Sequence, residues 1–590
     1  MRIFLLWNHL SNEGRKLVAE RVASKLQDIF SPLFGTPLSV TIQQTVAMTM
    51  VFAELPVRGW KPPFFQEDEQ GWACAVDYPI DARAVLAAND SPFGDDNVLP
   101  TLGRSLQANP LGLLRDMAPP FSLIWSSKEA EETFIQNDGL GQAQIFEYED
   151  GHLWALTNKI FALKALGVNL EFVPEDWAVR VTLGWFPSNL TGYKNVRFLP
   201  SGTQLKLDHS GLRRTRFDAL SDWVNPAPLR EQDSLELARC SVLKQIRAAM
   251  PLWEQADAGL TGGYDTRAVV CSLRVAGAQF QPRVKGHQGN YDVTIAMELA
   301  RIAGLPLSIE RLSELPAEDV ETSRRSITQA LLWQAGYINT DKHKSFLARE
   351  LFLKIGGVNI MGQDGALCRG VYVKKINALA MDPREYEKAL VNKLTKTRLP
   401  LVKKHFRAYV VEVITEAYRV AEKHRVTGLP ALEFFFLYER IRRWGSGVRS
   451  SQTGQIVAPL LNPDFIRATY AHPGHGREFE IFHKYIIERH APEWATIAYD
   501  KDFERRVESE DPGQSSWKTS NGKQYYNSLR WWKSVGYPLV ENALEEGGLW
   551  NQVFEPDLVS DMWQLAPDEL VMMHLLPCVV GSEPPAAVCR

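Results

Sequence analysis

The sequence predicts an α/β fold in two differently organised parts. Short apolar or alternating runs bounded by turn residues fill roughly residues 1–217 and predict an antiparallel, sheet-rich domain. From about Ser234, strand-like and helix-like segments alternate, which predicts parallel crossovers and a doubly wound sheet. Beyond Asp382 the pattern is mostly helical. We therefore expect a second domain, residues 218–590, that carries helical additions towards its carboxyl end.

The strands expected in the first domain are separated by clusters of Pro, Gly, Asn and Asp. The turn Glu149-Asp150-Gly151 lies between two of them and predicts a hairpin. These expected strands are Thr45–Ala53, Trp72–Val76, Phe121–Trp125, Gln144–Tyr148 and Leu153–Thr157.

In the second domain, apolar residues recur at helical spacing between short β-type runs. The expected strands are Ala258–Leu260, Gln281–Val284 and Leu307–Glu310. The expected helices are Ser234–Met250, Thr266–Ala276, Val293–Ile302, Arg384–Leu394, Lys403–Lys423, Ala431–Trp444 and Phe479–His490, with two shorter ones, Leu558–Trp563 and Asp568–Leu576, separated by Pro567. The polar stretch Asp511–Gly522 is expected to be a surface loop or a lid.

Composition excludes several classes of protein. The 590 residues are 45% hydrophobic and 23% charged, which excludes a largely disordered chain. A net charge of −4 argues against a broadly basic nucleic-acid binder. The six cysteines show no metal-ligand spacing, and no apolar run approaches the ~20 residues that span a bilayer. We expect a cytoplasmic protein with reduced thiols that binds neither nucleic acid nor membrane.

The segment from Gly259 to Arg267 carries the most chemical information. Its core, Thr261-Gly262-Gly263-Tyr264-Asp265-Thr266, lies where a strand should turn into a helix. Such a loop can direct successive backbone N–H groups at one anion, and the helix start adds partial positive charge. Asp265 would then be placed to hold the Mg²⁺ that accompanies a triphosphate. The alternative is a tight Gly-Gly turn that merely precedes a helix.

This loop resembles the SGGxDS loop of the ATP pyrophosphatases, with Thr in place of both serines. The surrounding chain resembles the asparagine-synthetase-like family from about residue 120 to residue 510. The matching segments include Asn137–Gly141, Leu156–Leu166, Thr182–Pro187, Lys194–Gly202, Lys285–Gly304, Glu433–Trp444 and Pro459–Asn462.

The resemblance implies an N-terminal Ntn-type α/β-β-α amidotransferase-like domain and a C-terminal ATP-pyrophosphatase domain. It also implies ATP and Mg²⁺ as substrate and cofactor. The implied metal ligands are Asp265 and Asp364, and Lys501 and Asp364 are the implied catalytic residues. The residues implied to contact ATP are Leu260, Thr261, Gly262, Gly263, Asp265, Thr266, Val284, Lys285, Gly286, Met361 and Gly362.

The chain departs from the family pattern at two places. Glutamine-hydrolysing members carry a Cys directly after the initiator Met, whereas this sequence has Arg2, so we expect the glutaminase to be inactive. In the family's acidic loop, the second metal-binding Asp corresponds to Ala366 and its Glu neighbour to Leu367. Asp364 is the one carboxylate left in that loop, and the loss of a carboxylate should weaken or alter catalysis.

Several other residues have two readings. Lys501, in a segment that resembles the family's RxKxxF motif, either stabilises the transition state or is a solvated lysine. Asp292 either interacts with its helix N-terminus or belongs to a magnesium shell. His472 and His475 have metal-like spacing, but a turn between helices explains them better. The run Arg440–Trp444 either grips an anionic substrate or is a solvated helix face.

The leading functional hypothesis is an ATP-dependent amide synthetase without glutaminase activity, akin to β-lactam synthetases and lasso-peptide cyclases. It would adenylate a carboxylate and join it to an amine, on a small-molecule or peptide substrate, and could act as a homodimer. The alternative is a pseudoenzyme, a nucleotide-binding or scaffolding subunit, which the replacements at Ala366 and Leu367 favour. A third reading is a synthetase that adenylates a different oxygen.

Overall fold

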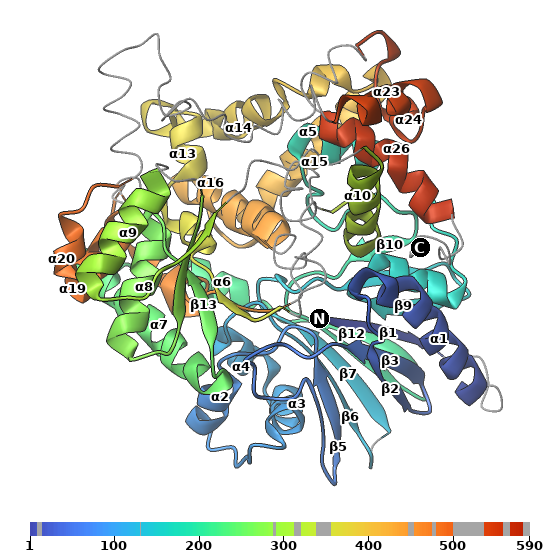
Figure 1. Cartoon of the computed structure of the whole chain (residues 1–590), viewed down its shortest axis with the longest axis horizontal. Helices are drawn as coiled ribbons and strands as arrows, with labels where there is room; N and C mark the ends of the chain where they lie inside the picture. Colours follow the sequence, from blue (N-terminus) through green and yellow to red (C-terminus); the bar gives the residue numbers. More distant parts are fainter. Residues whose placement is uncertain are drawn as a thin grey trace.

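The computed structural model describes residues 1–8, 15–129, 131–286, 291–311, 320–337, 356–445, 454–474, 480–499, 536–558 and 567–581. Two antiparallel sheets form the part drawn in blue and cyan in Figure 1, and a parallel sheet with its helices lies beside them in green. Helices drawn in yellow, orange and red complete the second half (Figure 1). The predicted fold class, a mixed α/β protein with these two kinds of sheet, is confirmed.

The first two sheets each have six strands. One has the order β10-β8-β9-β1-β3-β2 and the other β12-β11-β7-β6-β5-β4. Their bounds are β1 Arg2–Asn8, β2 Ser39–Gln44, β3 Met48–Glu54, β4 Phe65–Glu67, β5 Gly71–Ala75, β6 Ser122–Ser127, β7 Glu132–Asn137, β8 Phe146–Glu149, β9 Trp154–Thr157, β10 Val196–Phe198, β11 Thr203–Asp208 and β12 Gly211–Arg216. The hairpin expected at residues 149–151 joins β8 and β9, and Gly151 there has the positive φ of 87° that such a turn favours.

Strand β1 shows why the sheets stack as layers. Its side chains alternate between two faces, and both faces are buried. Phe4 and Leu6 belong to the core cluster that contains Cys74 of the second sheet. Ile3 and Leu5 belong to a separate core cluster with Phe30 of α1 (Arg15–Phe34). Helix α3 (Val98–Ala108) packs on β5 and β6 across the second sheet. The order of layers is therefore helix, sheet, sheet, helix, as expected for an Ntn-type domain.

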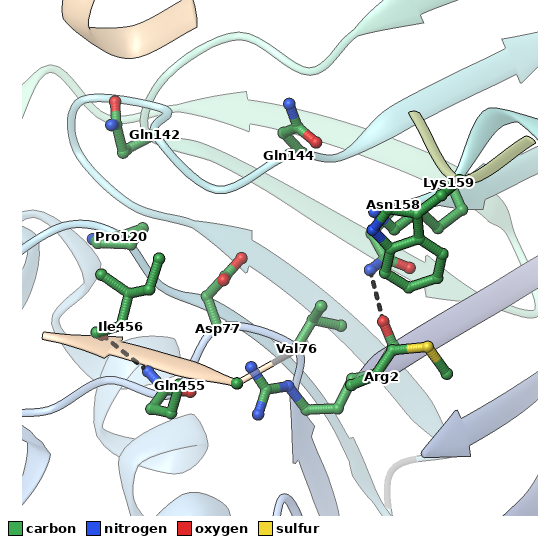
Figure 2. Close-up of a pocket in the computed structure, with 13 residues that line it drawn as sticks. Arg2, Val76, Asp77, Pro120, Gln142, Gln144, Asn158, Lys159, Gln455 and Ile456 are labelled. Atoms are coloured by element: carbon green, nitrogen blue, oxygen red, sulfur yellow. Dashed lines mark hydrogen bonds between the residues drawn. The ribbon is translucent and has the colours of Figure 1, made fainter. Parts of the chain in front are cut away.

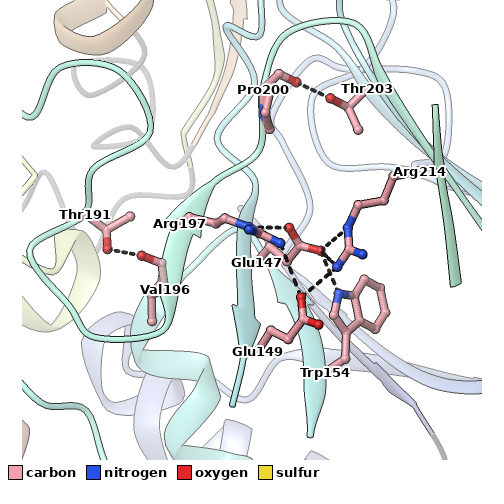
Figure 3. Close-up of polar contacts among 9 residues, drawn as sticks. All are labelled: Glu147, Glu149, Trp154, Thr191, Val196, Arg197, Pro200, Thr203 and Arg214. Carbon is pink, nitrogen blue, oxygen red and sulfur yellow. Dashed lines mark hydrogen bonds and ion pairs between the residues drawn. The ribbon is translucent and has the colours of Figure 1, made fainter. Parts of the chain in front are cut away.

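A charged network ties the edges of the two sheets together (Figure 3). Glu147 of β8 is buried, and its carboxylate accepts hydrogen bonds from Arg197 of β10, Arg214 of β12 and the Trp154 indole. Burial opposes ionisation of Glu147, but these three donors outweigh it and lower its pKa. Because Arg214 comes from the second sheet, the network holds the stacking of the two sheets at this edge.

The third sheet is parallel throughout and has the order β15-β14-β13-β16-β17. Its strands are β13 Ala256–Gly259, β14 Gln281–Gly286, β15 Ser308–Arg311, β16 Val358–Ile360 and β17 Gln455–Val457. The first strand in the chain, β13, lies in the centre, with later strands added first on one side and then on the other. This reversal of strand order is a topological switch point, where the loops after β13 and β16 diverge and leave a crevice.

The remaining helices surround these sheets. Their bounds are α2 Ala82–Ala88, α4 Pro110–Asp116, α5 Pro174–Leu183, α6 Ala219–Val224, α7 Glu231–Ala249, α8 Tyr264–Ala276, α9 Tyr291–Ala303, α10 Val320–Gln334, α13 Val371–Lys375, α14 Tyr386–Thr395, α15 Lys404–Lys423, α16 Leu429–Phe435, α18 Pro463–Ala471, α19 Ile481–His490, α20 Pro492–Ala495, α23 Tyr537–Glu546, α24 Trp550–Val553 and α26 Pro567–Gly581, with the 3₁₀ helices η1 Ile160–Leu166 and η4 Gln363–Cys368. The expected lid or loop Asp511–Gly522 lies outside the described residues.

The helix expected at Ala431–Trp444 has an unexpected form. α16 ends at Phe435 and continues as a π-helix, η8 (Phe436–Gly445). Arg442 and Arg443 on it are buried, so the reading of this run as a solvated face is wrong. Arg442 donates instead to the backbone oxygens of Gly141 and Leu199 in the first domain. None of the helices in the described ranges combines the length and the apolarity needed to cross a bilayer.

Candidate functional site

The loops after β13 and β16 meet at the switch point of the parallel sheet. A Cβ atom on Gly362, which follows β16, would lie 2.8 Å from the carbonyl carbon of Asp265. A Cβ atom on Gly365 would lie 2.7 Å from the Asp265 Oδ1 atom. A larger residue would displace the backbone of Asp265 at the first position and the surrounding side chains at the second. The two segments that the sequence singled out are therefore brought together at one place, although about a hundred residues separate them.

The loop Thr261–Thr266 is held by hydrogen bonds of its own. The Thr261 hydroxyl accepts from the Gly263 N–H at 3.1 Å, and the Thr266 hydroxyl accepts from the Thr261 N–H at 3.2 Å. The Gly262 N–H donates to Asp292 Oδ1 of α9 at 2.8 Å. A carboxylate oxygen thus already lies on a loop amide, which shows directly that this turn presents a donor to an anion.

Asp265 lies at the start of α8 and contacts two cationic side chains. Its Oδ1 atom accepts a hydrogen bond from Arg369 Nη2 at 2.5 Å and lies 2.8 Å from His483 Nε2. Arg369 also pairs with Glu480 at 3.0 Å, and His483 Nδ1 lies 3.4 Å from the same glutamate. We call Asp265, Arg369, Glu480 and His483 the four-residue charge cluster.

The electrostatics of this cluster are set by burial and by the partners. Burial alone would lower the pKa of His483, which is fully buried, but the neighbouring Cys368 sulfur and the Asp265 carboxylate raise it well above its ordinary value. Burial likewise opposes the charge on Arg369, and Asp265 and Glu480 raise its pKa. Both bases are therefore cationic at neutral pH, and the cluster contains two positive and two negative groups.

This arrangement does not fit a Mg²⁺ ion at Asp265. Oδ1 already faces a guanidinium and an imidazolium, and each would repel a divalent cation bound to that atom. No group of three or more His, Cys, Asp or Glu side chains in the described part of the chain is arranged to hold a metal. Asp364, the other expected ligand, is buried on η4 with 2% of its surface exposed. The metal ligands thus remain a prediction of the resemblance.

Three of the four residues in the charge cluster were not predicted as site residues. Arg369 lies in the stretch that follows the family's acidic loop, Glu480 and His483 belong to no motif, and more than a hundred residues separate Arg369 from His483 along the chain. Cys368 also lies here, with its sulfur 3.7 Å from His483 Nδ1, but it is fully buried and its thiol donates to the Gly365 carbonyl. A thiol in this position has no access to a substrate and serves packing.

The structure places the other expected ATP contacts around the same edge of the sheet. Leu260 and Val284 are buried, and the Leu260 N–H donates to the Arg283 carbonyl. The Lys285 ammonium points to Glu310 of β15, 2.9 Å away, so this side chain forms a surface ion pair. The Met361 N–H donates to the Val457 carbonyl, and Gly286 ends β14 opposite Arg311.

Lys501 lies outside the described residues, but the segment that leads to it contacts the loop. Tyr499 stacks on Tyr264 with ring centroids 3.8 Å apart, and the Arg267 guanidinium lies 3.9 Å above the Tyr499 ring. Arg267 also donates to the carbonyls of Ile497 and Ala498. This late segment is therefore anchored beside the glycine loop.

Two histidines, His472 and His475, have the spacing of metal ligands in the sequence. His472 Nδ1 lies 2.7 Å from the Ser234 hydroxyl in a buried contact between helices, which fits the expectation of a turn. His475 lies outside the described residues.

Comparison with known proteins adds little to this geometry. No family model matches the sequence, and no curated protein matches it significantly. Among solved structures, the chain is similar to glutamine phosphoribosylpyrophosphate (PRPP) amidotransferase from B. subtilis complexed with ADP and GMP, and to a structure described as the allosteric regulatory enzyme of purine biosynthesis. Each match has 12% identity and a TM-score of 0.25 over 52% of this chain. The matches span 65%, less than two thirds, of those chains. With so low a TM-score, fold and site rest on the geometry of this chain.

Proposed function

We propose that this chain binds ATP at the switch point of its parallel sheet and uses it to activate a carboxylate for amide formation. The observation that carries the proposal is the meeting of the Thr261–Asp265 loop with the Gly362–Gly365 segment, where a loop amide already holds a carboxylate oxygen. Ligands of doubly wound sheets bind at such switch points, beyond the carboxyl ends of the strands. The resemblance of the loop to the ATP pyrophosphatases supplies the substrate class.

The reaction follows from that class. A substrate carboxylate oxygen would attack the α-phosphorus of ATP, with pyrophosphate as the leaving group, and would give an acyl-adenylate. An amine would then attack the acyl carbon, lose a proton and expel AMP. The chain's contribution would be to hold the polyphosphate with loop N–H groups and with the positive start of α8, and to align the two reactants. Because the charge cluster does not fit Mg²⁺, the proposal assigns no step to a metal at Asp265.

A second candidate function is favoured by the same cluster. Arg369 and His483 neutralise the aspartate that should hold a cation, which is the arrangement expected of a nucleotide-binding subunit without turnover. The two candidates share the binding site and differ only in chemistry. They are therefore separated by the products formed from ATP.

The binding claim can be tested by isothermal titration with a non-hydrolysable ATP analogue. Asp292→Asn removes the negative charge that competes for the Gly262 N–H, so we expect the affinity to rise several-fold, by about 1 kcal/mol. Glu298→Gln is the matched control, because Glu298 lies on the same helix and pairs only locally with Arg301. An affinity that is equal in wild type and Asp292→Asn would refute the assigned site.

The chemical claim needs a product assay with candidate carboxylates and amines. Release of AMP and pyrophosphate supports the ligase. Release of ADP contradicts it, and binding without any cleavage favours the second candidate.

A further inference from the structure

A recess outside the charge cluster contains a buried arginine, Arg2, two of whose guanidinium nitrogens have no hydrogen-bond partner among the described residues. About 60 Å³ of it is open to the centres of water molecules. It is walled by Arg2 at the start of β1, by Asp77 after β5, by Gln144 and Lys159, and by Trp333 and Gln455 from the second half of the chain (Figure 2). Both halves of the protein therefore contribute to it, and it shares no residue with the charge cluster.

Three buried hydrogen-bond donors that line this recess have no acceptor among the described residues. Arg2 and Gln144 are each only 8% exposed. Nε and Nη1 of Arg2 and Nε2 of Gln144 are buried and have no hydrogen-bond partner within the described part of the chain. Buried donors of this kind cost free energy until an acceptor reaches them, and a charged donor costs more than a neutral one.

Other contacts hold Arg2 in position. Asn158 accepts from the Phe4 N–H and donates to the Arg2 carbonyl, which fixes the first turn of the chain into β1. The guanidinium lies 3.8 Å above the Phe64 ring. Figure 2 shows it directed towards Gln455, near the Asp77 carboxylate. A charged group that is held so firmly is pre-organised to receive a ligand.

The recess holds two bases whose charged forms burial disfavours, and carboxylates act on both of them. The Lys159 ammonium lies 3.6 Å from the centre of the Trp333 ring. Burial lowers the pKa of Lys159 to about 7, and the Asp77 carboxylate offsets this only in part. Burial lowers the pKa of Arg2 to about 10, and the carboxylates of Asp77 and Glu54 offset this only in part. A ligand carboxylate that reached the Arg2 guanidinium would favour its charged form.

The acceptors of the recess limit the kind of anion. The Asp77 carboxylate would repel a second negative charge on the ligand. Gln455 Oε1 is buried without a donor among the described residues, so it can accept a hydrogen bond from the ligand. A small hydroxy acid meets both conditions, since it carries one carboxylate and a hydroxyl donor.

We propose that this recess binds a small monocarboxylate that carries a hydroxyl group, with its carboxylate on Arg2 and its hydroxyl on Gln455. The ligand is organic and singly charged, in contrast to the polyphosphate proposed for the switch point. The site is independent of the proposed function, because neither set of residues enters the other argument.

The test is isothermal titration of the full chain with lactate, acetate and inorganic phosphate at constant ionic strength and neutral pH. We expect saturable 1:1 binding of lactate, weaker binding of acetate and the weakest binding of phosphate. Arg2→Gln should weaken lactate binding about tenfold or more, because it removes a charge-assisted hydrogen bond. Arg21→Gln, on the exposed face of α1, is the matched control and should leave the affinity unchanged.

A second variant keeps the proposal testable if Arg2→Gln fails to fold. Gln455→Leu removes the neutral acceptor and should weaken lactate binding several-fold. The absence of saturable lactate binding to wild type would show that water alone fills the recess and would overturn the proposal. Tighter binding of phosphate than of lactate, or full affinity in both Arg2→Gln and Gln455→Leu, would overturn it as well.

Discussion

Arg2 and Arg369 are both largely enclosed by protein, but their surroundings differ. Arg369 forms ion pairs with Asp265 and Glu480, whereas two nitrogens of Arg2 have no hydrogen-bond partner among the described residues. Removing one member of an enclosed ion pair leaves its partners uncompensated, while donors without an acceptor carry a free-energy cost that a ligand can remove. The comparison therefore assigns a structural role to Arg369 and a binding role to Arg2.

The comparison predicts its largest effect at Arg369. Arg369→Met removes one of the two cations that Asp265 and Glu480 share, and we expect the free energy of unfolding to fall by about 3 kcal/mol. Chemical denaturation monitored by circular dichroism measures it. Arg384→Met is the control, since Arg384 forms an exposed pair and should have almost no effect. A loss below that of the control would contradict the structural role.

At Arg2 we predict that a substitution raises the free energy of unfolding instead of lowering it. Arg2→Met replaces a guanidinium with two unsatisfied nitrogens by an apolar side chain of similar length, so the free energy of unfolding should rise by about 2 kcal/mol in a buffer without carboxylates. The same denaturation measurement applies, and Arg21→Met should leave the stability unchanged. If Arg2→Met destabilises the protein, the arginine already has a compensating partner and the comparison fails.

A third prediction concerns pH at the charge cluster. The pKa of His483 is raised in the folded state, so its stabilising contribution is complete below the ordinary pKa of about 6.5 and is lost as the pH rises through the raised value. His483→Gln should therefore cost about 1.5 kcal/mol at pH 6 and progressively less in alkaline buffer. Denaturation curves of both proteins from pH 6 to pH 10 measure the difference. A constant difference over this range would contradict the assigned charge.

The smallest effect is expected at Lys159, where stability should rise with pH, in contrast to His483. Its pKa is lowered to about 7 in the folded state, so the unfolded chain binds more protons above that pH and stability rises as the pH increases. The rise between pH 7 and pH 8 should be about 1 kcal/mol greater in wild type than in Lys159→Met. A parallel pH dependence in the two proteins would show that Lys159 does not titrate there.

The sequence was most informative where local chemistry determines structure. A Gly-Gly pair between a β-type run and an amphipathic run predicted the turn from β13 into α8, and Glu149-Asp150-Gly151 predicted a hairpin. The alternation of strands and helices after Ser234 predicted the parallel sheet. These features depend on neighbours in the chain, so their signal is visible in a short window.

The charge cluster and the recess around Arg2 could not be predicted in this way. Arg369 and His483 meet Asp265 only because η4 and α19 pack against α8. Trp333 reaches Lys159 from a distant helix. Burial likewise follows from tertiary packing, and for that reason Arg442 and Arg443 were open to a solvated reading although both lie in the interior. Only the folded structure shows which charges are paired.

The most direct test of the central claim is a crystal structure of the protein with a non-hydrolysable ATP analogue. We predict that a phosphate oxygen accepts a hydrogen bond from the Gly262 N–H and that the Asp292 carboxylate is displaced from this amide. Nucleotide bound elsewhere, or an undisturbed contact between Gly262 and Asp292 at saturating analogue, would contradict it.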